Sequence, residues 1–263
     1  MDLPLFPLHT VLCPGVALPL QVFEDRYKAM VDRCLAERSP FGVVLIREGR
    51  EVGPGELAVA AVGTVAEIRE ATRYRDGRYD LLTLGTQRFR LEAVDPAAEQ
   101  YLVGQITPLH EVLGEAARAK RLGERVVQLF IQYLELLRMD ESSQGRGRTD
   151  RTPDEPALSP LASEAGTSAG ARLAADESDD APAFEATELA RLLTIPEDPT
   201  VLSYLMTGIV QVESVRRQGL LEMPTTELRL VELAHLLERE IALLGRGLGT
   251  YTPDPRLAAL RRN

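Results

Sequence analysis

Residues 3–35 read LPLFPLHTVLCPGVALPLQVFEDRYKAMVDRCL, and this stretch decides the fold of the chain. It predicts a strand, a turn, a second strand and a helix, in that order. Pro14 and Gly15 predict a type II turn, because proline presets φ at the second turn position and glycine accepts a positive φ at the third. Residues 16–23 alternate as a half-buried strand does. Asp25 is then placed to cap a helix whose apolar positions recur three and four residues apart.

Two prolines interrupt the first apolar run of this stretch. Pro4 and Pro7 lie among Leu3, Leu5 and Phe6. Because proline has no N–H to donate to a strand ladder, we expect this run at a sheet edge or passing over a core.

The order of these residues follows a longer pattern over residues 3–27. It reads L-P-L-F-P-L-x-x-V-x-x-P-G, followed by L-P-L-x-V-F-E-x-R-Y. This pattern resembles the opening of the Lon substrate-binding domain, the N-terminal domain of ATP-dependent Lon proteases. Cys13 departs from it slightly, since an aromatic or aliphatic residue is expected there. Further matching segments are VGTVAEI (62–68), DGRYDLL (76–82), GTQRFRL (85–91) and the helical stretch 220–240.

The resemblance implies a fold, a function and a kind of partner. The implied fold is α+β, with an N-terminal PUA-like, mainly antiparallel β pseudo-barrel, one early helix and a C-terminal α-helical bundle. The implied function is non-enzymatic binding of unfolded or degron-bearing proteins and peptides by a free-standing bacterial member of the family, with a protease as a further partner. Lon itself adds an ATPase and a Ser-Lys peptidase, and the motifs of neither are visible in this sequence.

Composition divides the chain into five stretches. Short β-prone runs and Gly-containing turns fill the first, and Asp76-Gly77 is the strongest hairpin signal among them. After residue 112 the apolar spacing becomes helical. Residues 139–183 hold few large apolar side chains, so burial cannot offset the entropy of ordering them. The predicted stretches are a β-rich subdomain (1–112), a helix (113–138), a disordered insertion (139–183), the rest of the helical bundle (184–245) and a flexible tail (246–263).

Glycines and capping residues predict several element boundaries. A glycine interrupts a strand or ends a helix, and a carboxylate or hydroxyl before the first helical residue caps it. The predicted elements are strands 79–84 and 88–94 on either side of Gly85, a short helix at 184–193, a helix from Asp198 to Gly219, and a long helix from Thr225 to Leu244.

Charge and length limit the possible partners. The net charge of −10 opposes a nucleic-acid partner, because binding to phosphates needs clustered cations. No apolar run is long enough to span a bilayer, so we expect a cytoplasmic protein without a membrane partner. Two classes of function remain as alternatives, a small-molecule hydrolase or transferase and a PUA-like RNA-binding module. Arg88-Phe89-Arg90 is too short a basic run to favour the second.

The residues typical of catalysis and metal binding do not combine into a site. His9 and Cys13 are close in sequence, but a metal needs three or four ligands, so we predict neither a metal nor another cofactor. The only lysines, Lys28 and Lys120, follow no Gly-rich phosphate loop. Neither lysine has the buried setting that a Ser-Lys nucleophile pair requires.

The turn from the second strand into the first helix is the predicted peptide-binding site. Apolar and charged side chains stand next to each other there, and turns between elements often carry function. Tyrosine and arginine are also common anchors in binding sites. The candidate residues are Val22, Phe23, Glu24, Asp25, Arg26 and Tyr27.

Replacing residues 139–182 with a short Gly/Ser linker should leave the melting temperature within a few degrees. The segment has little apolar surface to bury, and the entropy of closing a loop depends only logarithmically on its length. Thermal unfolding followed by circular dichroism tests this. Loss of the cooperative transition would show instead that the segment packs against the folded part.

Overall fold

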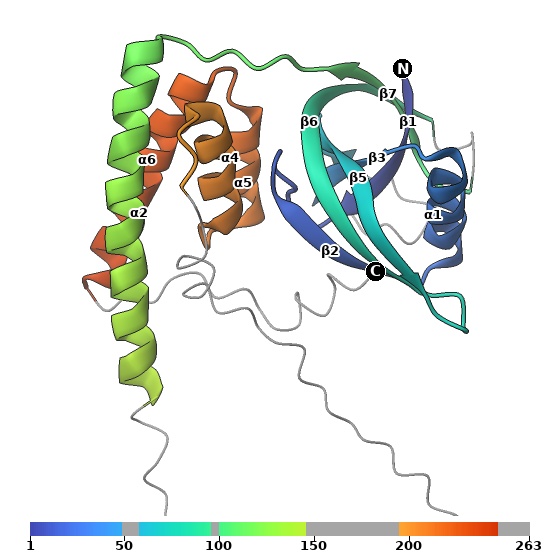
Figure 1. Cartoon of the computed structure of the whole chain (residues 1–263), viewed down its shortest axis with the longest axis horizontal. Helices are drawn as coiled ribbons and strands as arrows, with labels where there is room; N and C mark the ends of the chain where they lie inside the picture. Colours follow the sequence, from blue (N-terminus) through green and yellow to red (C-terminus); the bar gives the residue numbers. More distant parts are fainter. Residues whose placement is uncertain (49–57, 96–99, 146–194, 247–263) are drawn as a thin grey trace, which may run out of the picture.

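The computed structural model describes residues 1–48, 58–95, 100–145 and 195–246. A β-rich part comes first and the later helices stand beside it (Figure 1). The strands are β1 (Asp2–Leu8), β2 (Ala17–Val22), β3 (Phe41–Glu48), β4 (Ala58–Val59), β5 (Val62–Arg73), β6 (Tyr79–Asp95) and β7 (Val103–Pro108). The helices are α1 (Asp25–Glu37), α2 (Ala116–Gly145), α4 (Pro199–Ile209), α5 (Ser214–Glu222) and α6 (Thr226–Leu244). The predicted order, mainly antiparallel strands with one early helix and then helices, is confirmed.

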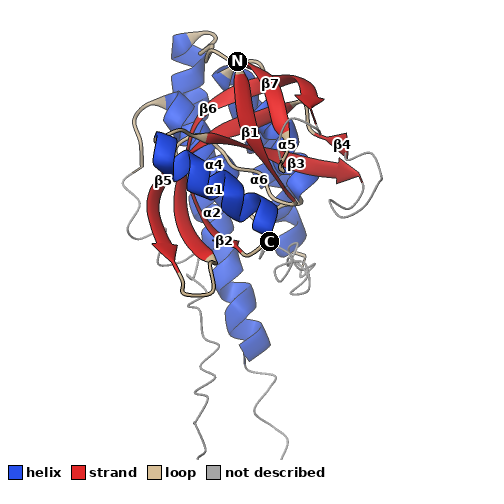
Figure 2. Ribbon diagram, turned by 90° about the vertical axis from the view of Figure 1, so that its right-hand side faces the viewer, coloured by secondary structure: helices blue, strands red, loops and turns tan. Residues whose placement is uncertain are grey.

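The sheet is mainly antiparallel and returns to its first strand. Its order is β1-β7-β6-β5-β3-β4, and β2 pairs with β6. Among the described strands, the one parallel pairing joins β1 to β3, so the hydrogen-bonded path β1-β7-β6-β5-β3 comes back to β1. Helix α1 covers the side of the sheet that faces away from α2, α4, α5 and α6, as Figures 1 and 2 show from two directions.

Strand β1 can contain Pro4 because the residues of β1 that hydrogen-bond to β7 are its odd-numbered ones. Ile106 N–H donates to Met1 O and Leu5 N–H donates to Leu102 O, so the odd residues of β1 bond to β7. Pro4 therefore lies at a position that needs no N–H on that side. The strand passes over the core and pairs on both sides, so the alternative of a sheet edge is wrong.

Two predicted turns are confirmed, and one predicted break is not. Gly15 has a φ of 74° in the turn before β2, and Gly77 has a φ of 86° in the β5–β6 hairpin. Gly85, in contrast, lies inside the single continuous strand β6. The backbone of Cys13 approaches this glycine so closely that a Cβ would collide with the Cys13 carbonyl oxygen. Gly85 is therefore needed for a close approach of two backbones, not for ending a strand.

The helix predicted from Asp198 to Gly219 is two helices, α4 and α5. The Asp198 carboxylate caps α4 as predicted and accepts from Thr200 N–H at 2.7 Å. The chain leaves the helix at Val210, and Arg217 of α5 donates to the carbonyls of Thr207 and Val210 at 3.1 and 2.8 Å. Arg217 is thus not part of a single long helix; it satisfies the last carbonyls of α4 and stabilises the break between α4 and α5.

Helix α2 is longer than the predicted 113–138. It runs to Gly145, so residues 139–145 are helical. The prediction that the disordered insertion begins at residue 139 is therefore wrong. No proline or internal glycine interrupts these residues, and extending a formed helix requires no new nucleation. The remainder of the predicted insertion, the helix predicted at 184–193 and residues 247–263 lie outside the described residues. Across the described helices, none is long and apolar enough to cross a membrane.

A cluster of charged and aromatic side chains joins the sheet to the helices, and in it Arg88, Tyr204 and Arg229 are buried while the Glu111 side chain is 33% exposed. Arg88 of β6 donates through Nε and Nη2 to the two carboxylate oxygens of Glu111, at 2.9 and 3.2 Å. Tyr204 of α4 donates to the same carboxylate at 2.6 Å. Arg229 of α6 is fully buried, lies 3.8 Å from the centre of the Tyr204 ring, and places Nη2 3.6 Å from Glu111.

The two arginines of this cluster also reach main-chain oxygens at the end of α5. Arg88 Nη1 donates to Leu221 O and Met223 O at 2.7 and 2.8 Å. Arg229 Nε donates to Leu220 O at 3.1 Å. These bonds satisfy the guanidinium groups that burial would otherwise leave without solvent, which is the condition for keeping a charge inside a protein.

An apolar cluster completes the contact between the sheet and the helices. It combines residues of β3 and of the connections β1–β2 and β4–β5 with residues of α4 and α5: Val11, Cys13, Leu45, Ala60, Tyr204 and Leu221. Gln218 of α5 adds a hydrogen bond from its side-chain amide to Val62 O at 2.9 Å. The two parts therefore meet through a continuous packed surface.

Glu111→Ala should lower the free energy of unfolding by roughly 2–3 kcal/mol, because both arginines stay buried without their carboxylate. Urea unfolding measures this. Glu238→Ala is the matched control, since it removes an arginine partner from an exposed pair, Arg125–Glu238 at 2.8 Å. Such an exposed pair is worth less than about 1 kcal/mol. Equal effects of the two substitutions would contradict a special role for Glu111.

Candidate functional site

The end of β2 borders a cleft of about 350 Å³. It lies between the turn into α1 and the β5–β6 hairpin. The ladder between β2 and β6 brings these parts together by pairing Val22 with Tyr79. The lining residues are Gln21, Val22, Phe23, Tyr74, Arg78, Tyr79 and Asp80. We call this cleft the aromatic cleft.

The six predicted site residues divide into buried and accessible groups. Val22 and Tyr27 have no exposed surface and belong to the core around α1. Both hold the turn in place; Val22 borders the aromatic cleft, but neither side chain is exposed. Phe23 is 42% exposed and lines the aromatic cleft, so it is the predicted residue best placed for binding.

The three charged residues of the turn make local ion pairs. Glu24 pairs with Arg26 at 2.8 Å, and Asp25 pairs with Lys28 at 2.6 Å. The predicted cap is wrong in detail, because Glu24 occupies the N-cap position and Asp25 is the first residue of α1. Glu24 makes no capping hydrogen bond, since its carboxylate turns to Arg26. Asp25 still favours the helix from its first turn through the helix dipole.

Residues of the β5–β6 hairpin were not predicted for this site. Tyr74 is 45% exposed and donates to Asp80 at 2.6 Å, and this bond is the main reason why its pKa is raised. Arg78 lies 5.7 Å from the centre of the Tyr74 ring. The hairpin signal at Asp76-Gly77 places Tyr74 and Arg78 near each other. It does not show that they face Phe23, because that depends on the pairing of β2 with β6.

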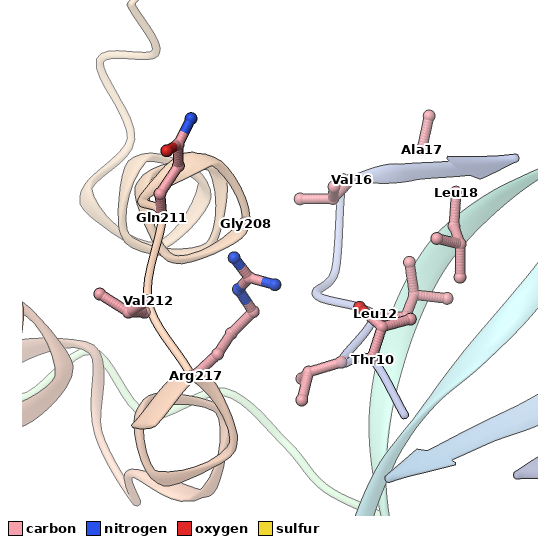
Figure 3. A pocket seen from close by; sticks show the side chains of 10 residues that line it. Thr10, Leu12, Val16, Ala17, Leu18, Gly208, Gln211, Val212 and Arg217 are labelled. Carbon is pink, nitrogen blue, oxygen red and sulfur yellow. The ribbon is translucent and has the colours of Figure 1, made fainter. Parts of the chain in front are cut away.

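A second cleft, of about 320 Å³, lies where the start of β2 meets α4 and α5 (Figure 3). Thr10, Val11, Leu12, Val16, Ala17, Leu18, Gly208, Gln211, Val212 and Arg217 line it. Figure 3 shows the Arg217 guanidinium extending toward the sheet side of this cleft. We call it the interface cleft.

A third cleft, of about 810 Å³, lies between α2 and the start of α4. Among its described lining residues, Lys120, Glu124 and Glu197 are charged and none is a serine, cysteine or histidine. The residues that the structure describes include no group of three or more histidine, cysteine or acidic side chains arranged to hold a metal.

The chain matches a known family over most of its length. A sequence model of the ATP-dependent protease La (LON) substrate-binding domain matches residues 2–239. The chain belongs to the Lon substrate-binding domain family. Among curated relatives of this family member, a Lon protease of Anaeromyxobacter dehalogenans is 31% identical over 138 residues, which are 49% of this chain and 16% of the relative. Lon protease 2 of Syntrophobacter fumaroxidans is 22% identical over 91% of this chain and 25% of its own.

Solved structures agree with this family fold. The crystal structure of a Lon N-terminal domain protein from Xanthomonas campestris has a TM-score of 0.53 and 22% identity, covering 89% of this chain and 98% of its own. The N-terminal domain of Mycobacterium avium complex Lon protease has a TM-score of 0.52 and 17% identity, covering 92% and 98%. This Lon-domain chain thus spans nearly all of these solved domains, but only 16% and 25% of the two curated proteases.

Both cysteines should resist alkylation in the folded protein. Burial raises the pKa of Cys13 to about 12 and is also the main reason for the raised pKa of Cys34. Because the thiolate is the reactive form, neither is an activated nucleophile at neutral pH. Iodoacetamide at pH 8, followed by mass spectrometry, should modify both cysteines in urea and neither without it. Rapid labelling of Cys13 in the native protein would contradict its burial.

Proposed function

We propose that this domain binds unfolded or degron-bearing segments of protein substrates and catalyses no reaction itself. The observation that carries the proposal is the aromatic cleft, where Phe23 and Tyr74 stand 42% and 45% exposed on elements far apart in sequence. Large aromatic side chains supply much of the energy in protein recognition. Two of them at one cleft suit the apolar side chains that an unfolded segment exposes.

The charges around the aromatic cleft favour a protein segment over a strongly charged ligand. Arg78 and Asp80 line the cleft, and the Glu24–Arg26 ion pair directly follows its lining residue Phe23 in the chain. Each of these two pairs holds both signs of charge, so a polyanion or polycation gains little. A mixed sequence with apolar anchors fits better, because a polar rim around an apolar centre is the usual anatomy of a protein-binding surface.

The alternative functions receive less support from the described residues. Arg88, the first arginine of the short basic run, is 2% exposed and bonds to Glu111, so it is not available to RNA phosphates. Cys13 is buried with a raised pKa, which argues against its use as a nucleophile in a small-molecule hydrolase or transferase.

The remaining parts of the proposal rest on the family. We take the closed path of strands to be a PUA-like pseudo-barrel and the later helices to be the helical bundle of the Lon domain. A protease is the proposed further partner, because the curated relatives are named Lon protease. The proposed location is the cytoplasm, and the proposal includes neither a nucleic acid nor a cofactor.

Glu24→Arg combined with Arg26→Glu should weaken binding of an unfolded protein several-fold. The two side chains form an ion pair at 2.8 Å in the native protein, and the exchange swaps the positions of the positive and negative charges next to Phe23. Because both side chains are partly exposed, the free energy of unfolding should change by less than about 0.5 kcal/mol. Fluorescence anisotropy with a labelled, reduced and carboxymethylated protein measures the affinity.

The matched control exchanges the charges of another exposed pair, Arg125→Glu with Glu238→Arg, on the distant helices α2 and α6. This exchange should leave the affinity unchanged. Circular dichroism confirms that both variants are folded. Unchanged affinity of the Glu24/Arg26 variant would place the binding site elsewhere. Equal weakening by both exchanges would indicate a general effect of charge.

A further inference from the structure

Three tyrosines in the described part of the chain donate a hydrogen bond from the ring hydroxyl to a carboxylate. The three pairs are Tyr79 with Asp32, Tyr204 with Glu111, and Tyr74 with Asp80. The rings of Tyr79 and Tyr204 are buried, whereas Tyr74 is 45% exposed. Tyr74 and Asp80 both line the aromatic cleft, so the third pair is the one that a ligand can reach.

An arginine completes each of the two pairs that contain a buried tyrosine. Arg73 lies 5.5 Å from the centre of the Tyr79 ring, with Nη1 3.8 Å from the carboxylate to which Tyr79 donates. Arg229 lies 3.8 Å from the centre of the Tyr204 ring, with Nη2 3.6 Å from the carboxylate to which Tyr204 donates. A guanidinium suits both contacts, because its plane stacks on aromatic rings and its N–H groups bind carboxylates.

The Tyr74–Asp80 pair has no such arginine within the described structure. The guanidinium of Arg78 lies 5.7 Å from the centre of the Tyr74 ring, but it pairs with Asp76. Asp76 accepts from Nε of Arg78 at 2.6 Å and from its backbone N–H at 3.1 Å, which ties Arg78 to the hairpin turn. Among the described residues, Asp80 forms no ion pair, so its carboxylate lines the cleft without a cation.

The surroundings of Asp80 are suited to a guanidinium. Phe23 and Tyr74 present two exposed aromatic rings at the same cleft, and no cation of the described residues lies over Phe23. The volume of about 350 Å³ is small for a ligand site, which suits one long side chain. The net charge of −10 also attracts a basic segment from a distance.

We propose that an arginine side chain of the client segment enters the aromatic cleft, pairs with Asp80 and lies against Phe23 and Tyr74. It completes the third pair as Arg73 and Arg229 complete the other two. Lysine fits less well, because its ammonium group is compact, strongly hydrated and unable to stack. The preferred clients are thus unfolded segments in which an arginine stands next to apolar residues. This inference rests on the proposed function and names the side chain that the cleft selects.

Asp80→Asn tests the ion pair directly. The asparagine keeps the size of the side chain and an oxygen that can accept from Tyr74, and it loses the charge. The probe is a fluorescein-labelled peptide of nine residues made of serine, glycine and leucine, with one central arginine between two leucines. A matched peptide carries citrulline, which has the shape of arginine without its charge, and a third carries lysine. Fluorescence anisotropy measures the affinities.

The wild-type protein should bind the arginine peptide about five-fold more tightly than the citrulline peptide, which is the scale of an exposed ion pair. It should bind the lysine peptide at least two-fold more weakly than the arginine peptide. Asp80→Asn should reduce the preference for arginine over citrulline to less than two-fold. Glu92→Gln is the matched control, because it neutralises an exposed carboxylate at the other end of β6, and it should leave this preference unchanged.

A measurement on the wild-type protein decides the question if circular dichroism shows that Asp80→Asn does not fold. The peptide then carries the photoreactive residue p-benzoylphenylalanine in place of the leucine after the arginine. Irradiation followed by mass spectrometry should locate the cross-link in the chain segments that contain Phe23 or Tyr74. Cross-links found only elsewhere would overturn the proposal.

The outcomes separate this inference from the proposed function. If the wild-type protein binds neither the carboxymethylated protein nor any peptide, the proposed function fails. If it binds the carboxymethylated protein but shows no preference for arginine over citrulline, the arginine site is wrong while the proposed function stands. An undiminished preference in folded Asp80→Asn would also overturn the site, because another group would then bind the guanidinium. Equal binding of the arginine and lysine peptides would overturn the choice of arginine.

Discussion

The carboxylate of Glu111 is the constraint on which the arrangement of the two parts depends. It accepts from Arg88 of the sheet and from Tyr204 of α4, and it lies near the buried Arg229 of α6. Burial lowers the pKa of Arg229 and raises that of Tyr204, whereas the Glu111 side chain itself is 33% exposed. The buried guanidinium groups of Arg88 and Arg229 require hydrogen-bond partners, so these bonds hold the helices in position against the sheet.

That position determines which clefts exist. The aromatic cleft belongs to the β-rich part and the turn into α1, and it depends on the pairing of β2 with β6. The interface cleft needs α4 and α5 beside the start of β2, where an added Cβ at Gly208 would lie 2.8 Å from Val16. Moving the helices would therefore change the interface cleft and leave the aromatic cleft. Strand β2 is common to both clefts, because its start lines the interface cleft and its end lines the aromatic cleft.

Much of the local structure followed from short patterns. The turn at Pro14-Gly15, the hairpin at Asp76-Gly77, and the caps Asp198 and Thr225 act through bonds within four residues, so neighbouring residues are enough to predict them. Long-range contacts decided the exceptions. Gly85 lies inside a strand, where it leaves room for the backbone of Cys13. The helix after Asp198 breaks, and Arg217 folds back on the carbonyls at the end of α4.

The sequence by itself determined the family and the order of strands and helices, and it named Phe23 as a candidate without deciding whether its side chain is exposed. The tertiary structure alone decided that Val22 and Tyr27 are core, that Tyr74 lines the same cleft as Phe23, and that β2 pairs with β6 among the described strands. The physical reason is the range of the interactions. Periodicity and capping depend on neighbours along the chain, whereas burial, strand partners and clefts depend on which distant segments pack together.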